Sequence, residues 1–330
     1  MMMTLRVKGK GDDNHNRLLY FLQMKLNLKY AQLQEIKQGK WLLSTHNDKW
    51  FLKEFSTEKK FMKQLILTKE LLKRGFNQVL AFHPFHQTSP IRFEGKIYGL
   101  MEWLDHEQDF DYSLEYNRQY ALQTLKQLHY VTKTILSERP KLSKYFDENN
   151  YLNKWESRLG EFTNNIPYLQ TFIPLYYLQA YRQWGEWALY KLKNMSGNHT
   201  NSCIIHGDVA HHNFLLSNKG KLYLIDFDLA SIAPEEVDDL QFANRILPYL
   251  KWSTNELFSP SLYHVYKEDN VFLMALIYPT DIYREWNRFL RENNHYKFKV
   301  WKYLMNLSID QFSSRMSFIQ KIGGWIQFQE

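Results

Sequence analysis

The stretch of sequence that decides the fold reads His206-Gly207-Asp208-Val209-Ala210-His211-His212-Asn213, and it is followed by Ile225-Asp226-Phe227-Asp228. Two short apolar runs lie in this region, Phe214–Leu216 and Leu222–Ile225, and a polar segment that contains Gly220 separates them. Apolar runs of this length around a polar, glycine-containing segment are typical of a β-hairpin. We expect the hairpin to bring Asn213 and Asp226 face to face at its open end.

The polar residues around this hairpin suit phosphoryl transfer from a nucleotide. That reaction needs a carboxylate that takes the proton of the acceptor hydroxyl, and oxygen ligands that hold Mg²⁺ against the phosphates. Asp208 can supply the first, and Asn213 and Asp226 can supply the second. Asp228 is a candidate ligand for a second ion or an acceptor for backbone donors, and His206 belongs to the candidate catalytic set. The alternative is a loop in which these residues only cap turns.

The complete pattern resembles the active site of the aminoglycoside and choline phosphotransferases. The stretch Leu125–Thr132 is also similar to a Leu-x-x-Leu-His-x-x-Thr segment of these enzymes, and the resemblance extends from about Lys53 to Trp252. It implies an α+β, protein-kinase-like fold of two lobes. The smaller lobe, residues 1–104, would hold an antiparallel sheet and one main helix, and the larger lobe, 105–330, would be mostly helical. ATP and Mg²⁺ are the implied cofactors.

Within this superfamily the chain is similar to the bacterial spore-coat kinase-like proteins of the CotS type. The features that carry this likeness are Trp50-Phe51-Leu52-Lys53, Arg74-Gly75-Phe76, Ile225-Asp226-Phe227-Asp228, Asn244-Arg245-Ile246-Leu247 and Lys251-Trp252. The resemblance implies a phosphotransferase acting on a hydroxyl of a small molecule or of a coat component. An alternative is a kinase fold with weak or lost catalysis that serves as a structural or binding component of the spore coat, with other coat proteins as partners. Phosphorylation of a metabolite such as homoserine or methylthioribose is a third hypothesis.

The N-terminal region has the element order of a kinase N-lobe. The apolar spacing predicts a helix over 17–28, a helix from Ser56 or Thr57 to Arg74, and strands over 31–37, 40–45, 49–55, 79–85 and 97–103. Ser56 or Thr57 is expected to cap the second helix, which Gly75 should end.

Lys53 lies on the third of these strands and matches the lysine that contacts the nucleotide phosphates in the family. A cation on an otherwise apolar strand needs an anion nearby, because burying it without a partner is costly. Glu58 and Glu70 on the following helix are the candidates, and we prefer Glu58. The alternative is a lysine on a half-exposed strand edge.

The nucleotide base is expected beside residues 99–104, which resemble the hinge between the lobes, with Met101, Glu102 and Trp103 offering backbone groups to it. A loop that covers phosphates normally contains several glycines, so that backbone amides can approach the anion. Residues 35–41 contain only Gly39. The lysines of this segment can compensate by charge, but the missing glycines favour the alternative of reduced catalysis.

The C-terminal part is predicted to be helical. The expected elements are helices over 116–135, 150–162 and 174–194 and a strand over 203–205. A further helix should open at Val237-Asp238-Asp239-Leu240, where Asp239 matches the family aspartate that caps the helix and braces the catalytic loop. The alternative for Asp239 is a simple helix cap.

Composition restricts the class of protein. With 44% apolar and 23% charged residues, global disorder is excluded. The single cysteine, Cys203, allows no internal disulfide, which indicates a reducing compartment. The N-terminus lacks the apolar core of a signal peptide, and the longest apolar run, Val271–Tyr278, is too short to span a bilayer. We expect a soluble, cytosolic protein that does not bind membranes, and the family likeness adds deposition in the spore coat.

Positive charge is concentrated near the N-terminus. Residues 1–80 contain 16 Lys and Arg against 7 Asp and Glu. Such a basic region suits a nucleotide triphosphate. No zinc-finger spacing or nucleic-acid-binding motif accompanies it, so we expect a nucleotide as the ligand and no nucleic acid as a partner.

Overall fold

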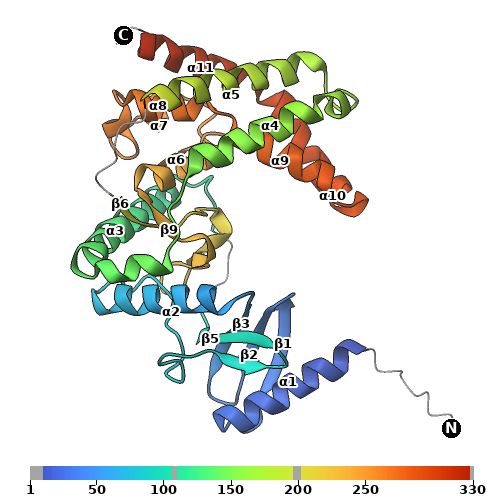
Figure 1. The fold of residues 1–330 in the computed structure, drawn as a ribbon, viewed down its shortest axis with the longest axis vertical. Helices are drawn as coiled ribbons and strands as arrows, with labels where there is room; N and C mark the ends of the chain where they lie inside the picture. Colours follow the sequence, from blue (N-terminus) through green and yellow to red (C-terminus); the bar gives the residue numbers. More distant parts are fainter. Residues whose placement is uncertain (1–9, 106–109, 196–201, 328–330) are drawn as a thin grey trace, which may run out of the picture. The chain divides into compact units, whose positions relative to one another are not determined.

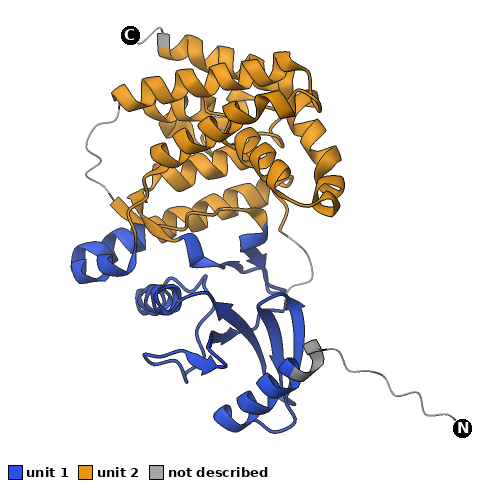
Figure 2. Cartoon of the chain, turned by 45° about the vertical axis from the view of Figure 1, so that its right-hand side comes forward, with its two compact units in different colours: residues 1–109, 130–146, 212–229 blue, residues 110–129, 147–211, 230–330 orange. Residues whose placement is uncertain are grey.

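The computed structural model describes residues 10–105, 110–195 and 202–327. The chain divides into two compact units, which Figure 2 shows in different colours. Unit 1 contains residues 1–109, 130–146 and 212–229, and unit 2 contains 110–129, 147–211 and 230–330. Each unit therefore combines three separate stretches of the sequence. The predicted boundary between residues 104 and 105 stays a prediction.

Unit 1 is built on a five-stranded antiparallel sheet with the strand order β1-β2-β3-β5-β4 (Figure 1). Its strands are β1 (Gln32–Lys37), β2 (Lys40–Ser44), β3 (Lys49–Phe55), β4 (Ile91–Phe93) and β5 (Lys96–Glu102). The helix α1 (Lys10–Leu26) packs its apolar side on this sheet through Leu18 and Leu22. These elements form one apolar core beneath the sheet.

The helix α2 (Glu58–Lys73) follows β3 directly. Its first turn is capped by Thr57, whose side chain accepts a hydrogen bond from the Lys60 backbone N–H, as the sequence predicted. In the sheet Lys53 pairs with Gly99 of β5. A methyl group at Gly99 would lie 2.8 Å from the Phe55 ring, so a larger residue at this position would require the ring to shift. The glycine therefore lets the rings of Phe55, Phe82 and Phe61 lie close to β5.

The predicted strand over 79–85 is wrong. Only an isolated bridge between Phe82 and Met101 forms there, although the His83 N–H still donates to Leu100 O. Pro84 cannot donate to a strand ladder, which prevents regular pairing from continuing. The fifth strand is β4 instead, and a tight turn with positive φ at Glu94 and Gly95 joins it to β5.

The predicted hairpin between the two decisive motifs is confirmed and belongs to unit 1. Its strands β7 (Phe214–Leu216) and β8 (Leu222–Leu224) pair in antiparallel register, with Phe214 opposite Leu224. The Leu224 N–H also donates to the carbonyl of Gln78, 2.8 Å away, which ties the hairpin to the segment between α2 and β4. Unit 1 also includes the 3₁₀ helix η1 (Pro140–Tyr145).

Unit 2 is mostly helical. It contains α4 (Tyr151–Leu169), α5 (Leu175–Met195), α6 (Glu236–Ile246), α7 (Thr254–Leu257), α8 (Asn270–Ile277), α9 (Thr280–Arg291), α10 (Asn294–Met305) and α11 (Phe312–Gln327). A long helix, α3 (Glu115–Glu138), begins in unit 2 and continues into unit 1. The strands β6 (Ser202–Ile205) and β9 (Ser231–Pro234) pair antiparallel in unit 2.

The core of unit 2 is aromatic. Trp155 stacks on Tyr278 with ring centroids 4.2 Å apart, and the Tyr278 hydroxyl donates to the Trp155 carbonyl. Trp286 is fully buried, and its Nε1 donates to Ser308 Oγ at 2.8 Å. Among the residues that the structure describes, no helix combines the length and the apolar composition needed to cross a bilayer.

Candidate active site

The loop that follows β6 is held by a buried aspartate of α6. The His206 and Gly207 backbone N–H groups donate to Asp238 Oδ2 and Oδ1, at 2.7 and 2.9 Å. His129 Nε2 lies 2.9 Å from the same Oδ2, and Asp238 and His206 are fully buried. Gly207 has a φ of 79°, a conformation that favours glycine. Asp238 therefore fixes the backbone just before Asp208.

The prediction that Asp239 braces this loop is wrong by one residue. Asp239 instead accepts a hydrogen bond from the Tyr266 hydroxyl at 2.6 Å. Successive residues of a helix point about 100° apart, so Asp238 and Asp239 cannot both face the loop. The sequence offers two adjacent aspartates, and only the rotation of α6 in the fold decides between them.

Asp238 and His129 form a charged pair. Burial opposes ionisation of Asp238, but the hydrogen bond and charge of His129 outweigh it and lower the pKa of the carboxyl group. Burial likewise opposes the charged form of His129, but the Asp238 carboxylate raises the pKa of this imidazole above its ordinary value. Both shifts favour an imidazolium–carboxylate pair under the catalytic loop. His129, to which the sequence assigned no role, is therefore the second partner of this brace.

Asp208 lies on the same loop in unit 2. Its Oδ1 accepts a hydrogen bond from Arg245 Nη2 of α6 at 2.7 Å, and its backbone N–H donates to His206 Nδ1 at 3.2 Å. The side chain is 32% exposed, which leaves the carboxylate accessible to a substrate. The next residue is held as well, because the buried Tyr112 hydroxyl donates to Val209 O.

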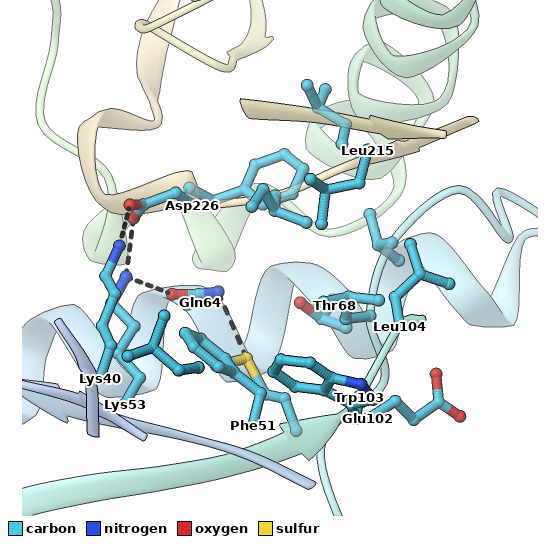
Figure 3. A pocket seen from close by; sticks show the side chains of 17 residues that line it. Lys40, Phe51, Lys53, Gln64, Thr68, Glu102, Trp103, Leu104, Leu215 and Asp226 are labelled. Atoms are coloured by element: carbon cyan, nitrogen blue, oxygen red, sulfur yellow. Dashed lines mark hydrogen bonds and ion pairs between the residues drawn. The ribbon is translucent and has the colours of Figure 1, made fainter. Parts of the chain in front are cut away.

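The predicted phosphate-contacting lysine, Lys53, meets two of the predicted metal ligands, Asp226 and Asp228, in one cluster of unit 1. Figure 3 shows Lys53 and Asp226. Lys53 Nζ donates to Asp226 Oδ1 and to Asp228 Oδ1, each at 2.7 Å. Lys40 of β2 donates to the second oxygen of Asp226 at 3.0 Å. Lys53 is only 4% exposed, so its charge is compensated almost entirely by these two carboxylates.

Asp226 combines a strongly lowered pKa with an uncommon backbone conformation. Burial disfavours its charged form, but the ammonium groups of Lys53 and Lys40 outweigh this and hold its pKa far below the usual range. Its φ of 66° lies in the left-handed region, which is uncommon outside glycine and which aspartate tolerates better than most residues. The carboxylate is therefore ionised, and both of its oxygens accept from lysines.

The expected pairing of Lys53 with Glu58 is wrong. Glu58 opens α2 and forms an exposed ion pair with Arg92, and Glu70 binds Arg74 and Arg139. The α2 side chain that reaches Lys53 is Gln64, with Oε1 at 3.4 Å.

A signal for this contact was present in the sequence. Gln64 lies on the buried stripe of α2 together with Phe61, Leu65 and Thr68, which have the spacing of one helix face. A polar residue in such a stripe needs a polar partner inside the fold, and Lys53 is that partner.

Asn213 ends the short 3₁₀ helix η2 (His211–Asn213) at the start of the hairpin, and it is buried. Its carbonyl accepts a hydrogen bond from the Ile225 N–H at 2.9 Å. The hairpin thus brings Asn213 opposite the residue that precedes Asp226. Direct coordination of one ion by Asn213 and Asp226 stays a prediction.

A cavity of about 210 Å³ in unit 1 opens beside the lysine–aspartate cluster. Its walls are mostly apolar and include Ile36, Phe51, Val79, Leu80, Met101, Leu104, Leu215, Leu224, Ile225 and Phe227. Figure 3 shows Lys40, Lys53 and Asp226 at one end and Glu102, Trp103 and Leu104 at the other. The predicted hinge residues thus line the same cavity as Lys53.

The hinge end of this cavity is fixed by hydrogen bonds. The Glu102 N–H donates to Ala81 O at 2.8 Å, and the Ala81 N–H donates to the Glu102 carboxylate at 3.1 Å. Met101 is buried beneath the cavity, where its sulfur accepts from Gln64 Nε2 at 3.6 Å. An apolar slot with a charged end can take a flat apolar ring joined to an anionic group.

Comparison with known proteins identifies the family of this chain. The sequence profile of the phosphotransferase enzyme family matches residues 34–243, which include Lys53, Asp208 and Asp226. A comparison with curated proteins found no match.

Solved structures of low sequence identity share the fold. An aminoglycoside phosphotransferase from Alicyclobacillus acidocaldarius superposes with a TM-score of 0.68 at 15% identity, over 91% of this chain and 93% of that one. Spectinomycin phosphotransferase, solved with ADP and spectinomycin, gives 0.67 at 15% identity over 91% and 98%. Choline kinase from Streptococcus pneumoniae gives 0.52 at 12% identity over 94% and 99%.

These likenesses confirm the predicted fold class, a kinase-like fold with a small antiparallel-sheet part and a larger helical part. The family match covers most of the chain, including both decisive motifs. The chain therefore belongs to the phosphotransferase enzyme family.

Proposed function

We propose that this protein is an ATP- and Mg²⁺-dependent phosphotransferase that acts on a hydroxyl group. The observation that carries the proposal is the position of Lys53, which bridges Asp226 and Asp228 at the charged end of an apolar cavity. Membership of the phosphotransferase enzyme family supports it.

ATP is the nucleotide that we propose for the cavity in unit 1. Its flat base suits the apolar walls, and the predicted hinge residues Met101, Glu102 and Trp103 line the cavity where the base would lie. Lys53 and Lys40 at the other end supply positive charge for the phosphates. The solved spectinomycin phosphotransferase contains ADP, which is consistent with this assignment.

The donor set fits Mg²⁺. Asp226 and Asp228 offer carboxylate oxygens and Asn213 an amide oxygen, and Mg²⁺ prefers oxygen ligands, with few from the protein and the rest from phosphates and water. The two carboxylates already accept ammonium groups, so this position attracts cations. We propose that these three residues hold the ion. Bound Mg²⁺ would supply positive charge against the phosphate oxygens during transfer.

Asp208 is the proposed general base. Its carboxylate takes the proton of the acceptor hydroxyl while the oxygen of that hydroxyl bonds to the γ-phosphorus of ATP. The bond between the γ-phosphorus and the oxygen that bridges to the β-phosphate breaks, and ADP leaves. Asp238 and His129 act as positioning residues, because they hold the backbone on which Asp208 lies.

We further propose a role in the bacterial spore coat, based on the likeness to the CotS-type proteins at residues 50–53, 74–76, 225–228, 244–247 and 251–252. The acceptor would then be a small molecule or a coat component. The competing function is a kinase fold kept as a binding or structural part of the coat. The single glycine of the segment over 35–41, at the turn between β1 and β2, favours that alternative.

Thermal unfolding with and without nucleotide tests the proposal. A ligand at about a hundred times its dissociation constant stabilises the folded state by roughly 2.7 kcal/mol, which gives a measurable rise in Tm. We expect ATP with Mg²⁺ to raise the Tm of the wild type, and ATP with EDTA to raise it much less. Asp226→Ala should abolish the rise.

Asp48→Ala is the matched control, because Asp48 is an exposed acid of unit 1 in the turn between β2 and β3. Its Tm should rise with ATP and Mg²⁺ as in the wild type. The absence of any response in the wild type at millimolar ATP would refute the proposal and favour the structural role. A response that persists in Asp226→Ala would refute the metal assignment alone.

A further inference from the structure

Lys40 and Lys53 lie opposite each other in the sheet of unit 1. Lys40 is the first residue of β2, and in the antiparallel register of β2 and β3 its partner is Lys53. Directly opposed residues point to the same face of a sheet, where like charges repel each other. Such a pair needs an anion near both ammonium groups. In this protein that anion is Asp226.

Asp226 gives one carboxylate oxygen to each lysine. Its Oδ1 lies 2.7 Å from Lys53 Nζ, and its Oδ2 lies 3.0 Å from Lys40 Nζ. Lys53 also donates to Asp228 Oδ1 at 2.7 Å, so Oδ1 is the oxygen of Asp226 that shares a cation with Asp228. The cation on Oδ2 is Lys40. The two oxygens of Asp226 therefore serve two different positions for positive charge.

The neutral partner on α2 leaves charge compensation to these aspartates. Gln64 Oε1 is 3.4 Å from Lys53 Nζ, and an amide oxygen carries no net charge. The carboxylates that contact Lys53 are those of Asp226 and Asp228. Because Lys40 contacts Asp226 as well, two ammonium groups already balance the two carboxylates.

The backbone of the sheet holds Lys40 in this position. Gly39 precedes it with a φ of 77° in the turn between β1 and β2, and the Gly39 carbonyl accepts a hydrogen bond from the Glu54 N–H at 2.8 Å. The turn is therefore tied to β3 directly beside Lys40. The Lys40 side chain is 34% exposed, against 5% for Lys53, so it can contact a bound phosphate while it stays on Asp226.

Asp228 is held on the side of Lys53. Lys63 of α2 donates from Nζ to the Asp228 carbonyl at 2.6 Å, and the Asp228 carboxylate accepts from Lys53. The sequence leaves open whether Asp228 binds a second ion or accepts hydrogen bonds. These contacts place its carboxylate beside Oδ1 of Asp226, away from the oxygen that Lys40 holds.

An ammonium group and a divalent ion compete for the same carboxylate oxygen. In protein kinases two Mg²⁺ ions accompany the nucleotide phosphates. Mg²⁺ binds its oxygen ligands at about 2.0–2.1 Å. An ion on Asp226 Oδ2 would therefore bring its charge against the Lys40 ammonium group, which is 3.0 Å from the same oxygen. Because like charges at such short separation repel strongly, Lys40 and a second ion exclude each other at this oxygen.

We propose that the ammonium group of Lys40 takes the place of one divalent ion, so that this protein binds its nucleotide with a single Mg²⁺. The inference rests on the proposed function and deepens it, because it concerns the number of ions at the same site. The single ion is the one assigned above to Asn213, Asp226 and Asp228. Lys40 stays on Asp226 and supplies the phosphates with the positive charge that a second ion would bring.

The number of metal ions bound with each nucleotide tests the inference. Mn²⁺ is the metal probe, because it also prefers oxygen ligands, and the nucleotide is the β,γ-imido analogue of ATP, which is not hydrolysed. Equilibrium dialysis of the full chain gives the excess of Mn²⁺ and of the analogue on the protein side, and their ratio is independent of the fraction of active protein. We expect a ratio of about one for the wild type and about two for Lys40→Met, where a second ion replaces the lost ammonium group.

The affinity for the nucleotide analogue gives a second measurement. Each ion that binds together with the nucleotide makes the apparent affinity rise with metal concentration until its site is saturated. Once Mn²⁺ saturates the single ion of the wild type, a further increase of about tenfold in Mn²⁺ should leave the wild-type affinity nearly unchanged. The same increase should strengthen binding to Lys40→Met by up to about tenfold.

Lys37→Met is the matched control, because Lys37 is an exposed lysine at the end of β1 in the same turn. Its ratio should stay at that of the wild type. Lys40→Gln is a second neutral variant that keeps a polar side chain, and it should gain an ion as Lys40→Met does. Circular dichroism confirms that each variant is folded.

Each other outcome overturns the inference. A ratio of about two in the wild type does so and leaves the proposed function standing, because nucleotide and metal still bind together. The same ratio in the wild type, Lys40→Met and Lys40→Gln shows that the lysine replaces no ion. A second ion in Lys37→Met would trace the gain to a general loss of positive charge. The absence of nucleotide binding by the wild type refutes the proposed function and the inference together.

Discussion

Replacement of Asp238 by asparagine tests the brace under the catalytic loop. The wild-type carboxylate accepts from two backbone N–H groups and from His129, and Asp238, His206 and His129 are buried while Gly207 is half-buried. Asparagine keeps the shape but replaces one acceptor oxygen by a donor, so at least one buried donor loses its partner. Removal of one member of a buried charged pair costs about 3–5 kcal/mol. We expect Asp238→Asn to lower the free energy of unfolding by that amount.

Asp239→Asn is the matched comparison, because the two aspartates are adjacent, buried and on the same helix. Burial raises the pKa of Asp239 to about 6, against the attraction of His129 and the hydrogen bond from Tyr266. A carboxyl group whose pKa is raised on folding destabilises the folded state as pH rises through that range. The penalty approaches about 3 kcal/mol at neutral pH. The free energy of unfolding of Asp239→Asn should therefore increase relative to that of the wild type between pH 4 and pH 7.

The stabilisation by the Asp238–His129 pair depends on pH in a different way. The pKa of Asp238 is lowered, so its contribution is present above the ordinary aspartate pKa and is lost as pH falls through the folded value. The pKa of His129 is raised, so its contribution is present below the ordinary histidine pKa and is lost as pH rises through the folded value. The loss of unfolding free energy in Asp238→Asn should therefore be largest between about pH 4 and pH 6.5.

Urea denaturation from pH 4 to pH 8, followed by circular dichroism and tryptophan fluorescence, measures both variants. A loss below about 1 kcal/mol for Asp238→Asn across this range would refute the argument for a buried charged brace. A larger loss for Asp239→Asn than for Asp238→Asn at pH 7 would show that the sequence-based choice of Asp239 was correct after all.

Three further substitutions test the nucleotide site of unit 1. Lys40→Met removes one of the two ammonium groups that contact Asp226, so we expect about tenfold weaker binding of ATP with Mg²⁺. Calorimetry measures this affinity, and an unchanged value would contradict the role of Lys40. Gly99→Ala should cost about 1–3 kcal/mol of stability through overpacking, and a variant with the Tm of the wild type would show that the aromatic rings can move. Gln64→Glu adds a third carboxylate around Lys53, so it should lower the Tm without ligand and enlarge the increase in Tm that ATP and Mg²⁺ produce. An unchanged Tm without ligand would contradict this electrostatic argument.

The predicted elements that formed are those with strong local signals. The hairpin after Asn213 and the strands around Gly39 are marked by apolar runs and by glycine-containing turns, and the structure has them within a residue or two. The strand expected over 79–85 fails because apolar spacing does not show where strand pairing ends. Pro84 limits the pairing, and the short β4 takes its place beside β5.

For the candidate site, the sequence suggests residues but does not show their contacts. Lys53 and Asp226 were both identified, but their direct ion pair joins positions 173 residues apart, and no local pattern reveals it. The same holds for Arg245 and Asp208, whose contact depends on the rotation of α6. Gln64 was not predicted, because a buried lysine is expected to have a charged partner, whereas on α2 the fold places a neutral amide beside Lys53.

Because the chain alternates between the two units, it affects how the protein folds during translation and where it can be truncated. The chain passes between the two units at residues 109, 129, 146, 211 and 229. During synthesis, unit 1 lacks its second hairpin and Asp226 until residue 229 has left the ribosome, although its large sheet is finished by residue 102. A fragment that ends near residue 109 would expose Lys53 without its carboxylate partners. We therefore expect that the nucleotide cavity matures late in translation, and that no simple truncation isolates either unit in folded form.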